Sequence, residues 1–116
     1  MLPFRKRYTL DQRKEESIRI RCRKPEFTPV IMERASQSVP ALDKEKYLIP
    51  PDLTAAQLVF VIRRRLHMKS SQALFLLCHG KIVSGTTTIR EIYDAHRLTS
   101  EDGFLYMTYA LENVFG

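Results

Sequence analysis

The stretch at residues 54–67, TAAQLVFVIRRRLH, predicts the long helix around which the rest of the chain can be arranged. Thr54 stands three residues before Gln57, the spacing of a capping box. In that device the threonine hydroxyl accepts from the third backbone N–H, and the glutamine side chain reaches back to the cap N–H. Residues 58–62 are apolar over more than one helix face, so we expect them to be covered on two sides, or covered on one and adhesive on the other.

The same helix-start device occurs twice more. Thr9 precedes Gln12 and Thr88 precedes Glu91 at the same spacing, and a run without Pro or Gly follows each threonine. The first box predicts a mostly polar helix over about residues 10–23 that stops before Pro25, and the second predicts a short helix over about residues 89–95.

Strand patterns lie between the predicted helices. Apolar, β-branched or aromatic runs predict strands at residues 30–32, 47–49, 73–78, 81–83 and 104–109. One long helix between a first hairpin and later strands is the plan of the ubiquitin-like β-grasp, an α+β fold. In that plan the strands at the two ends of the core are parallel neighbours at the sheet centre, and the basic N-terminal helix is an addition.

Length and charge limit the possibilities further. The 116 residues suit one compact domain, which we divide into a basic helical part (1–24) and a β-grasp core with its C-terminal tail (25–116). No apolar run reaches the roughly 18 residues that span a bilayer, and we expect a cytosolic chain. Residues 1–24 hold nine Lys or Arg against three acids, which accounts for the whole net charge of +6. This segment could bind nucleic acid, anionic lipid or an acidic partner, or serve only as a solvated face.

Catalytic and metal-binding patterns find little support. The chain has no glycine-rich phosphate loop, and His67, His79 and His96 have no Cys, Asp or Glu at ligand spacing. Cys78 and His79 are adjacent, and neighbours in a strand point to opposite faces, so we expect the imidazole to face away from the sulfur. Cys22 and Cys78 suggest free thiols in a reducing compartment. We therefore expect no enzyme, metal or cofactor.

The strand at residues 47–49 suggests peptide recognition. It is short and ended by Pro50-Pro51, which is typical of a sheet edge to which an extended peptide can add a strand. Lys44 and Lys46 beside it would attract an acidic peptide. The alternative from these residues alone is an edge guarded by lysines against aggregation.

From Leu42 onward, the segment LDKEKYLIP (residues 42–50) resembles the GABARAP/light-chain-3 family of autophagy ubiquitin-like modifiers. The similarity continues through residues 52–54, 57, 60, 62–67, 73–75, 92–93, 104–106, 109 and 114–116. Upstream, residues 29–31 and 33 also fit, so the resemblance covers nearly the whole chain from about Leu10. It implies the β-grasp core with two N-terminal helices, the first being a turn near residues 3–7.

The resemblance also implies a function. In the family, activating and conjugating enzymes carry a terminal glycine as a thioester and join it to the head-group amine of phosphatidylethanolamine, and a cysteine protease processes and releases the protein. Gly116 occupies that position, and a glycine carboxylate with no side chain can enter a narrow channel. We thus expect an adaptor on autophagosomal or other vesicle membranes that recruits cargo receptors, with tubulin as a further partner and no nucleic acid.

Carried over by position, the family's two pockets for acidic aromatic-x-x-aliphatic motifs fall on residues of this chain. The aromatic pocket would consist of Glu16, Ile20, Pro29, Lys44, Lys46, Leu48 and Phe104. The aliphatic pocket would consist of Tyr47, Ile49, Pro50, Leu53, Leu58, Val61 and Arg65. The alternatives are a modifier attached to protein lysines, and an unconjugated basic scaffold that binds microtubules or RNA through residues 1–24.

Overall fold

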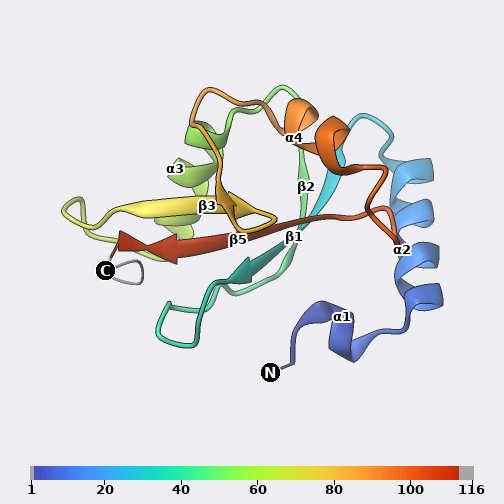
Figure 1. The fold of residues 1–116 in the computed structure, drawn as a ribbon, viewed down its shortest axis with the longest axis horizontal. Helices are drawn as coiled ribbons and strands as arrows, with labels where there is room; N and C mark the ends of the chain where they lie inside the picture. Colours follow the sequence, from blue (N-terminus) through green and yellow to red (C-terminus); the bar gives the residue numbers. More distant parts are fainter. Residues whose placement is uncertain (1, 113–116) are drawn as a thin grey trace.

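The computed structural model of the protein describes residues 2–112 and shows an α+β fold built on one five-stranded sheet (Figure 1). The strands are β1 (Thr28–Arg34), β2 (Lys46–Ile49), β3 (Leu74–Cys78), β4 (Lys81–Ile82) and β5 (Leu105–Leu111). The helices are α1 (Phe4–Arg7), α2 (Leu10–Arg23), α3 (Ala55–Arg65) and α4 (Ile89–His96). Within this part of the chain, no helix has the length and apolar character needed to cross a membrane.

The sheet has the strand order β2-β1-β5-β3-β4. Its centre is the parallel pair β1 and β5, in register from Val30 opposite Leu105 to Arg34 opposite Tyr109, and the other neighbours are antiparallel. This confirms the predicted β-grasp arrangement, in which strands from the two ends of the core meet in parallel. The predicted limits of helices and strands differ from the observed ones by at most two residues at either end.

All three predicted capping boxes form. The hydroxyls of Thr9, Thr54 and Thr88 each accept from the backbone N–H three residues later, and the return bonds from the side chains are also present. α3 ends at Arg65, two residues earlier than predicted, because His67 adopts a left-handed conformation with φ 54°. Such a residue turns the backbone out of the helix, a role that glycine fills more often.

One face of the sheet carries the main core. α3 and α4 cover this face (Figure 1), and Val30 and Met32 of β1 point into it, together with Leu58 and Ile62 of α3. Because side chains alternate along a strand, Ile31 between them points to the opposite face, where it meets Phe4 and Phe104 in a smaller cluster. This second face is covered by α1 and α2.

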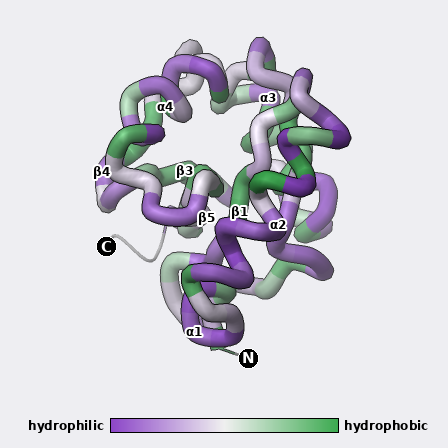
Figure 2. Tube along the Cα trace, turned by 90° about the vertical axis from the view of Figure 1, so that its right-hand side faces the viewer, coloured by the Kyte–Doolittle hydropathy of each residue, from purple (hydrophilic) through white to green (hydrophobic). Residues whose placement is uncertain are grey.

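α2 is attached to the sheet mainly through polar contacts, and Figure 2 shows the hydrophilic residues along it. The guanidinium Nη1 of Arg13 donates to the buried Asp102 carboxylate at 2.6 Å, and the Ser17 hydroxyl donates to the Asp102 carbonyl. Gly103 has φ +89°, and a Cβ there would lie 2.7 Å from Ser17 Oγ. Position 103 therefore needs glycine both for its backbone conformation and for the close approach of α2.

Candidate functional site

β2 forms one edge of the sheet, and among residues 2–112 it pairs with β1 alone. Met32 N donates to Glu45 O at 2.8 Å, and Tyr47 lies opposite Val30 in the register. Hydrogen-bonded and non-hydrogen-bonded pairs alternate along an antiparallel ladder, so the backbone groups of Lys46 and Leu48 are directed away from β1. These groups are available to a further strand.

The side chains of β2 divide between the two faces of the sheet. Tyr47 and Ile49 are buried in the main core with α3, whereas Leu48 is 40% exposed and Lys46 is half-buried. The period-2 alternation of a strand therefore separates the two predicted pockets, the aromatic one toward α2 and the aliphatic one toward α3.

The residues predicted for the aromatic pocket lie close to one another, with one exception. Lys46 Nζ contacts Glu16 Oε1 at 2.9 Å, and Pro29 lies opposite Leu48 in the β1–β2 register. Ile20 and Phe104 meet in the smaller apolar cluster. The exception is Lys44, whose Nζ lies 4.8 Å from the ring centroid of Tyr47, on the aliphatic side of the strand.

A surface depression of about 300 Å³ opens beside Lys46 and Glu16, and Phe4 and Tyr8 also line it. These two aromatic residues were not among those predicted for the pocket. Their rings lie 5.0 Å apart, and Phe4 packs edge-on against Phe104 with ring centroids 5.4 Å apart. Their spacing of four residues next to a basic turn is the signal that could have identified them.

The residues predicted for the aliphatic pocket differ in accessibility. Leu58 is buried in the main core with Tyr47 and Ile49, and Leu53 packs against that core while partly exposed. Pro50, Val61 and Arg65 are exposed. The Arg65 guanidinium lies 5.5 Å from the Tyr47 ring centroid and 3.3 Å from the Asp43 carboxylate. Of the residues predicted for this pocket, the apolar ones with accessible surface are therefore Pro50, Leu53 and Val61.

Two titratable groups in this region are perturbed. The ammonium of Lys46 donates to Glu16, and this hydrogen bond, with a second from Arg19, lowers the pKa of the Glu16 carboxyl below its ordinary value. Burial raises the pKa of Tyr47 to about 12, and its hydroxyl has no hydrogen-bond partner within the described chain. Lys46 is thus already paired with an acid that a peptide carboxylate would have to replace.

Gly116, the predicted conjugation residue, lies outside the described residues 2–112.

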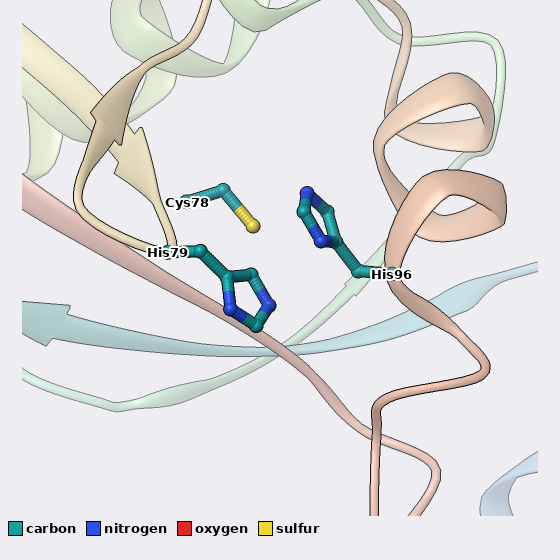
Figure 3. A group of neighbouring side chains, drawn as sticks. All are labelled: Cys78, His79 and His96. Atoms are coloured by element: carbon teal, nitrogen blue, oxygen red, sulfur yellow. The ribbon is translucent and has the colours of Figure 1, made fainter.

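The structure corrects one expectation about cysteine and histidine. Atoms of Cys78, His79 and His96 able to bind a metal all lie within 4.8 Å of one another (Figure 3), so the prediction that the His79 ring faces away from the sulfur is wrong. The alternation of side chains along a strand does not extend to His79, because β3 ends at Cys78 and His79 has φ 51°. His96 comes from the end of α4, a proximity that sequence spacing could not reveal.

Comparison with known proteins identifies the family. A sequence model of the family described as "Autophagy protein Atg8 ubiquitin like" matches residues 12–116, most of the chain. The chain belongs to the Atg8 family. Autophagy-related protein 8b of Arabidopsis thaliana is 46% identical over 108 residues, covering 92% of this chain and 87% of the relative. Autophagy-related protein 8 of Schizosaccharomyces pombe is 42% identical over 114 residues, covering 97% and 93%.

A solved structure agrees with this assignment. The crystal structure of Trypanosoma brucei ATG8 superimposes with a TM-score of 0.87 at 31% identity, covering 97% of this chain and 96% of that one. The chain is therefore an autophagy-related, ubiquitin-like protein of the Atg8 family, as its resemblance to the GABARAP/light-chain-3 modifiers implied.

Proposed function

We propose that this Atg8-family chain is conjugated through Gly116 to phosphatidylethanolamine and acts on autophagosomal membranes as an adaptor. Its ligands are cargo receptors that carry an aromatic residue and an aliphatic residue three positions apart, next to acidic residues. The enzymes that activate, transfer, process and release it are the proposed partners at the C-terminus. The chain itself performs no catalysis in this proposal.

The observation that supports the adaptor role is the open edge of β2. The backbone groups of Lys46 and Leu48 can pair with an extended peptide, and apolar surface lies on both sides of the edge. Residues two apart on an added strand share a face, whereas residues three apart point to opposite faces. An aromatic-x-x-aliphatic motif therefore places one side chain toward α2 and the other toward α3.

Charge supports the same ligand class. Lys44 and Lys46 flank the edge, and Lys46 reaches its partner Glu16 across the rim of the depression. An acidic flank on the peptide would compete with Glu16 for the ammonium and would speed association at low salt.

The basic N-terminal segment is partly used within the fold. Arg7 pairs with Glu45, Arg13 pairs with Asp102, and Arg21 donates to the Gly103 carbonyl at 2.6 Å. These contacts reduce the charge left for an unconjugated scaffold on microtubules or RNA, so we favour the membrane adaptor.

Lipid conjugation is tested by mass spectrometry of the protein from intact cells. We expect an adduct of phosphatidylethanolamine at Gly116 that is strongly reduced in Gly116→Ala. An isopeptide bond between Gly116 and protein lysines, without the lipid adduct, would replace this proposal with that of a protein-directed modifier. Partner binding with no conjugate of either kind would favour the scaffold.

Peptide docking is tested by fluorescence anisotropy with a labelled acidic aromatic-x-x-aliphatic peptide. Leu48→Ala removes exposed apolar contact surface and should weaken binding by about tenfold. Ile82→Ala is the matched control, because Ile82 is 57% exposed on β4 at the opposite edge of the sheet. Equal losses in the two variants would contradict the assignment of the β2 edge.

A further inference from the structure

Three side chains with metal-binding atoms meet at the β4 side of the sheet, away from the open edge of β2. Cys78 ends β3, His79 begins the turn to β4, and His96 ends α4. Their sulfur and nitrogen atoms lie within 4.8 Å of one another, and Figure 3 shows the two imidazoles beside the sulfur. This cluster shares no residue with the proposed peptide site.

The backbone fixes this arrangement. Cys78 pairs with Lys81, so His79 and Gly80 form a two-residue hairpin loop, and both have positive φ, at 51° and 76°. Two successive positive φ values are typical of a type I′ turn, in which histidine is tolerated in the left-handed region. The turn directs the His79 ring toward His96, and the rings stack with centroids 4.2 Å apart.

We propose that Cys78, His79 and His96 form a binding site for a zinc ion, which joins the β3–β4 turn to the C-terminal end of α4. Thiolate sulfur and neutral imidazole nitrogen are the ligands that zinc prefers, and zinc imposes no strong geometric demand of its own. The three residues supply one sulfur and two nitrogens from two separate elements.

The distances are compatible with zinc after a small contraction. Zinc–nitrogen bonds of about 2.0–2.1 Å and zinc–sulfur bonds of about 2.3 Å place tetrahedral ligand atoms roughly 3.3–3.7 Å apart. The ligand atoms of the three residues now lie within 4.8 Å of one another, so zinc binding would bring the most distant pair closer by about 1 Å. A metal lies in the plane of each imidazole that binds it, so the two rings, now 20° from parallel, must turn out of their stack. Rotation of a histidine ring about its last torsion is soft.

The site is open to solvent on one side, so a fourth ligand can reach the zinc ion. His79 is exposed and His96 is half-buried, and both line a surface depression of about 400 Å³. A water molecule can reach the metal from this side. Three protein ligands with one open position is a coordination pattern that zinc adopts in proteins.

Binding requires one proton to leave. The Cys78 thiol lies 3.6 Å from the Tyr106 carbonyl oxygen, and burial raises its pKa to about 11, so the free protein holds it as S–H. Zinc binding forms a zinc–sulfur bond, and the thiol proton passes to solvent. Burial and the neighbouring His79 lower the pKa of His96, which keeps its imidazole neutral and ready to donate a lone pair.

The test is a titration of the full reduced chain with Zn²⁺ in competition with a chromophoric chelator. We expect one tight site per chain, and at least about tenfold weaker binding in Cys78→Ser and in His96→Asn. The matched controls are Cys22→Ser, at the exposed cysteine, and His67→Asn, at another histidine with positive φ. Both controls should bind as the unaltered chain does. Equal affinity in Cys78→Ser and the unaltered chain would overturn the proposal.

A second measurement does not depend on the folding of any variant. Co²⁺ added to the unaltered chain should produce a thiolate-to-cobalt charge-transfer band and the intense visible bands of a four-coordinate ion, and Zn²⁺ should remove both. Zn²⁺ should also raise the thermal midpoint of the unaltered chain. A cobalt spectrum with only weak six-coordinate bands would overturn the proposal, even with metal bound elsewhere on the surface.

Discussion

The two faces of the sheet are covered in different ways. Under α3 and α4 the contact is a continuous apolar cluster in which Ile62 and Tyr109 are almost inaccessible. Under α1 and α2 the apolar cluster is small, and the attachment depends on Arg13, Ser17 and Arg21 contacting residues 102–103.

The two faces of the sheet should therefore respond differently to mutation, pH and salt. Apolar burial depends on area and tolerates changes in pH and salt, whereas ion pairs and hydrogen bonds act at particular atoms and in particular protonation states. The α3 face therefore holds most of the apolar burial, while the attachment of the α2 face depends on a few named contacts. The proposed aromatic pocket lies on that second face.

The largest effect should come from Tyr109→Ala on the core face. It removes a buried ring, at about 3–5 kcal/mol, and two hydrogen bonds of the hydroxyl, to Pro40 O and from Leu42 N, at about 1 kcal/mol each. Tyr109→Phe keeps the ring and should lose only about 2 kcal/mol. Urea unfolding measures both, and equal losses would show that packing on this face contributes little.

Asp102→Asn should cost about 3–5 kcal/mol, because the buried Arg13 guanidinium loses its counter-charge. The carboxylate also accepts from Tyr106 Oη at 2.5 Å and from Phe104 N at 2.9 Å. Asp52→Asn is the control, since its pair with Arg90 is exposed and contributes at most about 1 kcal/mol. Urea unfolding measures the loss of unfolding free energy in both variants. Similar losses in the two would mean that the α2 face does not depend on the contact between Arg13 and Asp102.

Loss of a helix cap should affect global unfolding when the helix belongs to the α3 face of the sheet, and only local opening when it belongs to the α2 face. Thr54→Ala and Thr9→Ala each remove a capping box and should cost about 1 kcal/mol locally. In Thr54→Ala we expect a lower global unfolding free energy, because α3 is part of the core. In Thr9→Ala we expect faster amide hydrogen exchange at the start of α2, with the global value nearly unchanged. Identical exchange patterns would refute this division.

The smallest effect concerns acid. Contacts with Lys46 and Arg19 hold the pKa of Glu16 below its ordinary 4.5. Their contribution is therefore fully present above about pH 4.5 and is lost as the pH falls through the lowered value. Its size should be under about 1 kcal/mol. Glu16→Gln should flatten the acid limb of the stability curve, and a curve parallel to that of the unaltered chain would show that Glu16 contributes nothing to the acid dependence.

Local patterns predicted much of this fold. The three threonines mark three real helix starts, and the apolar excess of residues 58–62 reflects a helix with Leu58 and Ile62 in the core and Val61 at the surface. Capping and periodicity involve residues close in sequence, so one sequence contains the whole signal. The parallel pairing of β1 with β5 was predicted from the order of elements, and the sheet register confirms it.

Contacts between distant residues could not be predicted in the same way. The burial of Asp102 depends on Arg13, and the meeting of His79 with His96 depends on a turn with positive φ at a residue other than glycine. The pocket residues carried over by resemblance remain proposals. The structure places most of them around β2, yet it directs Lys44 to the other side of the strand.

The parallel pair at the sheet centre also has a consequence for the order of folding. The residues of β1 are made early in synthesis, but its partner β5 contains nearly the last described residues, so the central ladder cannot close while most of the chain is still being made. Loop-closure entropy makes such long-range pairing slow. Until the residues of β5 are made, Val30, Ile31 and Met32 lack part of the structure that buries them, and exposed apolar surface of this kind favours aggregation.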